Sequence, residues 1–97
     1  MTKSEQPGYA KTIHKENDKF TLDQLQKLVG GYIQVIELKD DRQMIINEEG
    51  KLMGLPYNDT ATKIYNHHFG RGDYISGDAI ILSGKAKLSW ESLPARK

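Results

Sequence analysis

The sequence contains no cysteine, which excludes disulfide bonds and thiolate metal sites and fits a reducing compartment. It also has little net charge, because 14 basic and 13 acidic residues leave a formal charge of +1. This balance argues against a nucleic-acid binder that relies on bulk charge. No apolar run approaches the roughly 20 residues that span a bilayer, and residues 1–8 lack the apolar core of a signal peptide. We therefore expect a cytoplasmic protein.

The length of 97 residues predicts one domain with a thin core, because so short a chain buries only about 60–65% of its unfolded surface. Hydrophobic residues make up 37% of the chain and charged residues 28%, as in soluble globular domains. We expect a disordered segment at residues 1–8, a single domain at residues 9–84 and a basic tail at residues 85–97. The exposed edges of a short sheet favour pairing with a second copy, so we expect a homodimer.

The strongest local pattern is a helix that begins after Thr21 and ends at Gly30. Thr21 and Gln24 have the spacing of a capping box, and Phe20 and Leu25 occupy the positions of a hydrophobic staple. Gly30 is the expected left-handed terminator. Apolar residues at helical spacing form one stripe: Leu22, Leu25, Leu28 and Val29.

The remaining patterns predict several strands and a second helix. The helix begins at Asn58 or Asp59, which are both good N-caps, and ends near His67 or His68. Together the elements have the order β-α-β-β-(β)-α-β, which indicates an α+β fold with a small, mostly antiparallel sheet. Two helices on one face of this sheet would make a two-layer sandwich. Strands are predicted at residues 9–14, 32–38, 43–47 and 79–82, with a further short strand at 51–53.

Three segments resemble a small phage and plasmid family that is catalogued as domain of unknown function 3846. They are LQKLVGGYIQV at residues 25–35, INEEGKLMGLPYN at residues 46–58 and GDAIIL at residues 77–82. The resemblance covers roughly residues 20–84 and does not include the basic tail. It implies a phage or mobile-element origin, hence the host cytoplasm, and a compact α+β domain. It implies no catalytic residues, because the family has none established.

The segment from Asn47 to Gly50 is the first candidate site, because it places polar residues at the end of a strand. As a polar lip over a ligand, Asn47 would recognise a base or an amide, and Glu48 would accept hydrogen bonds from hydroxyls or amines. The family motif continues from this lip to Asn58. The alternative is an ordinary turn, in which Asn47 caps the strand and Gly50 takes a positive φ.

Other conspicuous residues do not indicate catalysis, a metal or a cofactor. His67 and His68 are adjacent, so on a helix they point about 100° apart and do not easily share one metal ion. Asp73 belongs to an Arg-Gly-Asp tripeptide, which we interpret as a loop. Neighbouring carboxylates in turns are usually solvated, and no serine lies in a nucleophile-elbow motif. We therefore predict that the protein is not an enzyme.

The tail combines basic residues with the single tryptophan, Trp90. Such a segment suits contact with nucleic acid or with a protein partner. The alternative is a solvated tail in which Trp90 packs on the edge of the domain. The tail's basic residues are Lys85, Lys87, Arg96 and Lys97.

Three functions remain at this point. The first is a small non-enzymatic phage accessory protein that binds and inhibits a host defence or regulatory protein, with Trp90 as one contact. The second is a sponge that sequesters a small nucleotide signal between protomers. The third is a nucleic-acid-associated accessory protein that uses its tail. The contacts of the sponge would be Asn47, Glu48, Asn58 and Tyr65, each of which also has a structural interpretation, Tyr65 as a residue at the core edge.

Overall fold

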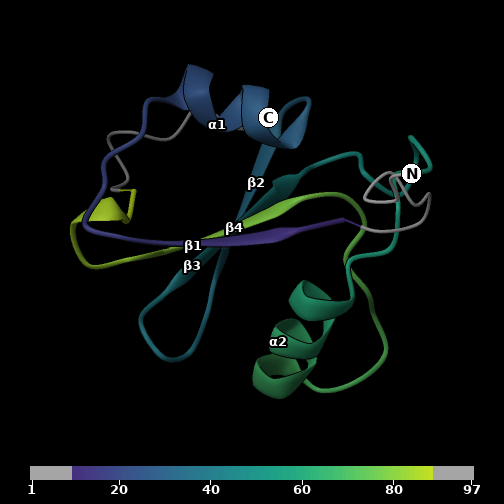
Figure 1. The fold of residues 1–97 in the computed structure, drawn as a ribbon. Coiled ribbons are helices and arrows are strands. Elements are labelled where there is room, and N and C mark those ends of the chain that lie inside the picture. The colour runs from purple at the N-terminus through teal and green to yellow at the C-terminus, as the bar shows by residue number, and fades with distance from the viewer. Residues whose placement is uncertain (1–9, 89–97) are drawn as a thin grey trace, which may run out of the picture.

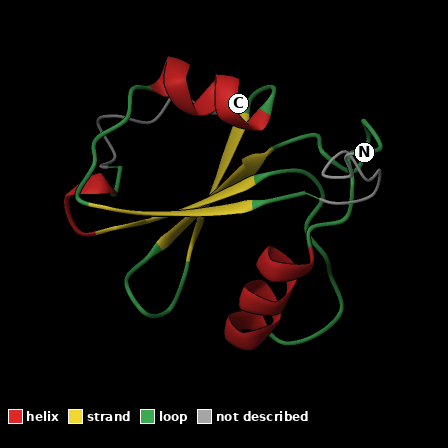
Figure 2. Cartoon of the chain, viewed as in Figure 1, coloured by secondary structure: helices red, strands yellow, loops and turns green. Residues whose placement is uncertain are grey.

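The computed structural model describes residues 10–88, which form a four-stranded mixed sheet with two α-helices (Figures 1 and 2). This arrangement confirms the predicted α+β class. The strand order is β1-β4-β3-β2, so β1 and β2 lie at the two edges. In chain order the elements are β1 (Thr12–Glu16), α1 (Leu22–Val29), β2 (Ile33–Glu37), β3 (Gln43–Asn47), α2 (Asp59–Phe69) and β4 (Ala79–Ser83).

The sheet is mostly antiparallel, as predicted. β3 pairs antiparallel with both β2 and β4, whereas β1 pairs parallel with β4. The short strand predicted at residues 51–53 is wrong, because this segment is a turn. Its backbone groups bond locally, from the Met53 N–H to the Glu49 carbonyl (2.9 Å) and from the Gly54 N–H to the Lys51 carbonyl (3.1 Å). These local bonds use the groups that a strand ladder would need.

The two helices lie on opposite faces of the sheet, so the predicted two-layer sandwich is wrong. α1 packs through Leu25 and Val29 on the face that carries Ile45, whereas α2 packs through Ala61 on the face that carries Met44. Successive side chains of a strand point to opposite faces, so β3 and β4 each supply both cores. Their unbroken apolar runs are typical of strands that are buried on both faces.

The first helix has the predicted caps. The Gln24 N–H donates to Thr21 Oγ1 (3.1 Å), and the Thr21 N–H donates to Gln24 Oε1 (2.9 Å), which completes the capping box. Gly30 has φ 82°, the left-handed conformation that ends the helix. α1 therefore forms largely from local sequence information.

We predict that Thr21→Ala lowers the free energy of unfolding by about 1 kcal/mol, because the Gln24 N–H loses its acceptor at the first turn of α1. Urea unfolding monitored by circular dichroism measures this change. Asp23→Ala is the control, because Asp23 is exposed and its ion pair within residues 10–88 is the surface contact with Lys27, so the change should cost about 0.5 kcal/mol or less. Equal losses for the two variants would contradict the cap.

The chain beyond β4 stays on the face that α1 covers. A short 3₁₀ helix (Gly84–Ala86) buries Ala86, and Leu88 packs against the same core. The Gln43 side chain fixes this segment, since its Nε2 donates to the Leu88 carbonyl (2.9 Å) and its Oε1 accepts from the Leu88 N–H (2.7 Å). Residues 1–8 and Trp90, for which the sequence analysis made predictions, lie outside the described residues. Neither α1 nor α2 has the length and apolarity needed to cross a bilayer.

Candidate functional site

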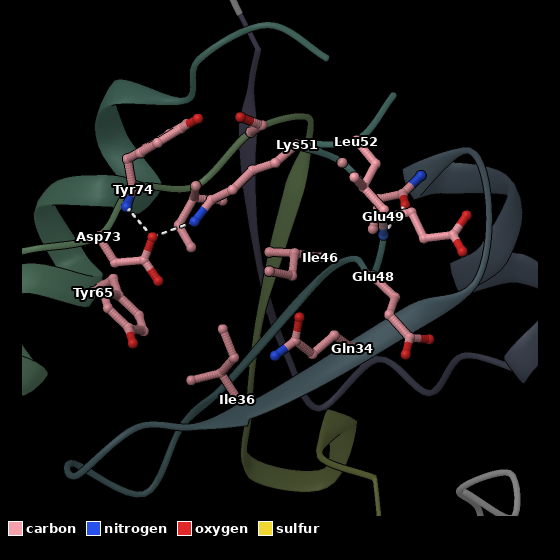
Figure 3. Close-up of a pocket in the computed structure, with 14 residues that line it drawn as sticks. Gln34, Ile36, Ile46, Glu48, Glu49, Lys51, Leu52, Tyr65, Asp73 and Tyr74 are labelled. Atoms are coloured by element: carbon pink, nitrogen blue, oxygen red, sulfur yellow. Dashed lines mark hydrogen bonds and ion pairs between the residues drawn. The ribbon is translucent and has the colours of Figure 1, made fainter. Parts of the chain in front are cut away.

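A pocket of about 400 Å³ opens on the face of the sheet that α2 covers (Figure 3). Its floor is apolar, formed by Ile36 of β2 and Ile46 of β3. One wall is the turn after β3, and the opposite wall is α2 with the chain that follows it. The volume falls in the range of about 300–1,000 Å³ that is usual for small-ligand sites. The polar and aromatic lining residues include Gln34, Glu48, Glu49, Lys51, Tyr65, Asp73 and Tyr74.

Asn47 holds the turn that forms the first wall. Its side chain is buried, its Nδ2 donates to the Val29 carbonyl (3.0 Å) and its Oδ1 accepts from the Glu49 N–H (2.7 Å). These bonds tie the turn to the end of α1. The amide of Asn47 therefore positions the turn at the end of the strand, which is the role that the ordinary-turn alternative gave it.

Gly50 brings the two walls together. A Cβ at this position would lie 2.6 Å from the Ser76 carbonyl oxygen, so only glycine allows the turn to approach this closely. Gly50 does not have the positive φ that the turn interpretation predicted, whereas Gly54, four residues later, does (φ 69°). The need for glycine at position 50 thus comes from packing.

Lys51 links the walls across the pocket mouth. Its Nζ forms an ion pair with Asp73 and lies 4.5 Å from the centre of the Tyr74 ring (Figure 3). The hydrogen bond from Lys51, together with one from the Tyr74 N–H (2.8 Å), lowers the pKa of Asp73 below the usual 3.8. A carboxyl group with this pKa stays ionised near neutral pH. It suits a lasting charge contact better than proton transfer.

The charge of the lining is acidic. Among the described lining residues, Glu48, Glu49 and Asp73 carry carboxylates and Lys51 carries an ammonium group. Tyr65 of α2 adds an aromatic ring beside the apolar floor. In chemical terms the pocket can hold an apolar stem that ends in a hydrogen-bond donor or a cation. Within residues 10–88, no group of three histidine or acidic side chains is placed to hold a metal ion.

The structure brings together three of the five residues that the sequence analysis proposed for binding. Asn47, Glu48 and Tyr65 line the pocket, although they come from two distant parts of the chain. Asn58 lies elsewhere, fully buried as the N-cap of α2, where its Oδ1 accepts from the Ala61 N–H (2.9 Å). Trp90 is the fifth, beyond the described residues.

Sequence reasoning missed Gln34, Lys51, Asp73 and Tyr74. Lys51 and Gln34 both lie inside segments that resemble the family, and this is the signal that was available for them. Asp73 belongs to the tripeptide that we interpreted as a loop. That interpretation is correct locally, but only the tertiary fold shows that this loop faces Lys51.

Exposed apolar side chains flank the turn after β3 and form what we call the exposed rim. Leu52 and Tyr74 line the pocket, whereas Tyr32 and Met53 line a second hollow of about 290 Å³ that shares Asn47 and Glu49 with it. Leu52 is 87% exposed and Tyr32 69% exposed. The rings of Tyr57 and Tyr74 lie 6.0 Å apart, so these two residues form one aromatic pair. The exposed rim consists of Tyr32, Leu52, Met53, Tyr57 and Tyr74.

The histidine pair has a structural place at the end of α2. His68 Nδ1 accepts from the Lys39 N–H (3.1 Å), and its Nε2 lies 3.6 Å from Asp40 Oδ2. A hydrogen bond from Arg42 lowers the pKa of Asp40. These contacts join α2 to the turn between β2 and β3.

The fold and the site define a small mixed-sheet α+β domain with an acidic pocket bordered by exposed aromatic and aliphatic side chains. The chain belongs to the family described as Domain of unknown function (DUF3846), whose model matches residues 1–96. The match extends beyond residues 20–84, the segment of the resemblance, and includes the basic tail with Trp90. No curated protein and no solved structure matches the chain.

Proposed function

We propose that this protein is a non-enzymatic phage accessory protein that binds and inhibits a host defence or regulatory protein in the host cytoplasm. The observation that carries the proposal is the exposed rim beside the acidic pocket. Large apolar side chains that gather on one part of a small domain are typical of protein-binding surfaces. The phage origin rests on the resemblance of the three sequence segments to phage and plasmid proteins.

The rim has the composition of a binding centre. Tyrosine is enriched among the residues that contribute most to protein interfaces, and three of the five rim residues are tyrosines. Leu52 projects from the turn that Asn47 and Gly50 hold in place. Because Leu52 is almost fully exposed, its burial under a partner would contribute about 1.5–3 kcal/mol.

The pocket adds charge selectivity to this surface. The carboxylate of Glu49 favours a basic side chain of the partner, whose aliphatic stem would lie on Ile36 and Ile46. The ammonium of Lys51 lies 4.5 Å from the centre of the Tyr74 ring, and this cation–π contact supports a preference of the ring for cations. Complementary charge of this kind mainly governs specificity and the rate of association.

The pocket volume favours the sponge as the alternative function, since about 400 Å³ accommodates a small ligand. The acidic lining is less suited to the phosphates of a nucleotide, because Lys51, the one cation among its described residues, is paired with Asp73. The nucleic-acid function gains little from the described part of the tail, where Lys87 forms an ion pair with Asp41 (2.5 Å).

The test is an affinity pull-down of tagged protein from bacterial lysate, with native mass spectrometry of the eluate. We expect a stoichiometric host protein, and we expect Leu52→Asp to reduce its recovery at least tenfold. Leu28→Asp is the control, because Leu28 is 40% exposed and lies on α1 outside the rim. Recovery of the host protein by Leu52→Asp at the level of the control would exclude the rim. Elution of a small molecule without a protein would favour the sponge.

A further inference from the structure

The outer edge of β2 has a row of backbone groups directed away from the sheet. The Leu38 N–H donates to the Arg42 carbonyl, and the Glu48 N–H donates to the Tyr32 carbonyl, both at 2.8 Å. In an antiparallel pair this places the backbone groups of even-numbered residues toward β3. The groups of Ile33, Val35 and Glu37 therefore point outward, and no residue between 10 and 88 bonds to them.

The two edges of the sheet differ in how well they resist pairing. β1 has His14, Lys15 and Glu16 in succession, and charged residues of this kind discourage the addition of a strand. β2 has the sequence Ile-Gln-Val-Ile-Glu, with no proline, no lysine and one charge at its end. Among the strands described, β2 is thus the edge that remains open to a further strand.

We propose that a second copy of this chain pairs with β2 in antiparallel orientation, with the two-fold axis at Val35. In this register Val35 lies opposite Val35 of the second copy, and Ile33 lies opposite Glu37 of the second copy. These are the residues with outward backbone groups, so the pairing forms about six backbone hydrogen bonds. Between these hydrogen-bonded pairs, Gln34 lies opposite Ile36 of the second copy in a non-hydrogen-bonded pair, where the two strands are closest.

The strand is self-complementary in this register. Like charges directly opposite each other would destabilise the pair. Glu37 instead lies opposite an isoleucine of the second copy. The Glu37 carboxylate also keeps its own partner, the Nε2 of Gln43 at 2.9 Å. Val35 is half-buried beside the α1 core, and a second Val35 next to it extends the apolar contact.

The pairing has a direct consequence for the pocket. Gln34 and Ile36 line it from β2, so the same two residues of the second copy come to lie beside its open side. An axis perpendicular to the sheet places both pockets on the same face. The dimer therefore has one symmetric groove that contains two acidic pockets. The groove's use as a binding site rests on the proposed function, whereas the pairing itself does not.

The absence of cysteine makes a register test possible, since every introduced thiol is unique. Gln34→Cys and Ile36→Cys proteins are mixed and oxidised mildly. At closely spaced antiparallel positions the Cα atoms are about 4.5 Å apart, within the disulfide range. We expect a disulfide-linked species of twice 11.0 kDa in the mixture, at least fivefold more than in either protein alone. Equal yields in all three samples would overturn the register.

The matched control for position is His14→Cys on β1, which should not link to Gln34→Cys above background.

Light scattering of the unmodified protein should give a dimer, and Val35→Pro should give a monomer, because it removes the central outward N–H. Val35→Thr keeps that N–H and the branched shape, so it should remain dimeric. A strict monomer of the unmodified protein at several hundred micromolar would overturn the proposal. A monomer that still captures a host protein would leave the proposed function standing, and a dimer that captures nothing would leave the pairing standing.

Discussion

Asn58→Ala is expected to lower the free energy of unfolding by about 2–4 kcal/mol, the largest loss among the substitutions considered. The fully buried Asn58 side chain makes four hydrogen bonds that join the ends of three elements. Its Oδ1 accepts from the Ala61 N–H and from Thr12 Oγ1, both at 2.9 Å. Its Nδ2 donates to the carbonyls of Gly77 (2.9 Å) and Lys11 (3.1 Å).

The size of this loss follows from what the alanine leaves behind. The cap of α2 accounts for about 1 kcal/mol. The buried Gly77 carbonyl then has no described partner, which costs about 1–3 kcal/mol. The Lys11 carbonyl keeps its bond from the Ala79 N–H (3.0 Å), so it adds little.

Urea unfolding followed by circular dichroism is the measurement. Asp59→Ala is the neighbouring control, because Asp59 is exposed in the first turn and, among the described residues, pairs with Lys63 at the surface. It should cost about 0.5 kcal/mol or less. If Asn58→Ala lowers the free energy of unfolding no more than this control does, the four hydrogen bonds of Asn58 do not stabilise the fold as we infer.

Gly50→Ala is expected to cost about 1–3 kcal/mol in the free energy of unfolding, as overpacked sites do. The added Cβ would meet the Ser76 carbonyl oxygen at 2.6 Å, so the turn after β3 must move away from the opposite wall. This movement separates Lys51 from Asp73. We therefore also expect weaker capture of the host protein, and the pull-down with purified variant measures it beside the unfolding curve.

Two asparagine substitutions test whether steric crowding or backbone conformation explains the need for glycine in this turn. Gly50→Asn should cost at least as much as Gly50→Ala, because the clash is at the Cβ. Gly54→Asn should cost about 1 kcal/mol or less, because asparagine tolerates the left-handed conformation better than other residues and no atom lies within 4 Å of the added Cβ. The reverse order would show that φ, and not packing, decides the need for glycine in this turn.

Local sequence was sufficient where the physical cause is local. Thr21, Gln24 and Gly30 specify both ends of α1 within ten residues, and Asn58 marks the start of α2. The layer arrangement was missed because it depends on which faces of β3 and β4 are covered. The continuous run from Met44 to Ile46 does indicate burial on both faces, and it was the signal for a layer on each side.

Only the part of the site that is continuous in sequence was predictable. The segment from Asn47 to Gly50 was identified because its polar residues and glycine are consecutive. The opposite wall comes from Tyr65 and from residues 73–76, which reach the pocket only through the placement of α2. No periodicity or motif links Asp73 to Lys51, since 22 residues separate them. The roles of Asn47 and Asn58 also depend on distant carbonyl groups, which the sequence does not show.

The central position of β4 sets the order in which the domain can be assembled during translation. Of the described strands, β4 is the last to leave the ribosome, yet it lies between β1 and β3 and pairs with both. Lys11 and Asp78, which are hydrogen-bonded beside this pairing, are 67 residues apart. A contact of such long range forms late, because closure of a long loop precedes it. β1, made first, must wait for β4 before it can join the sheet, so a nascent chain released early lacks the strand that unites the two halves.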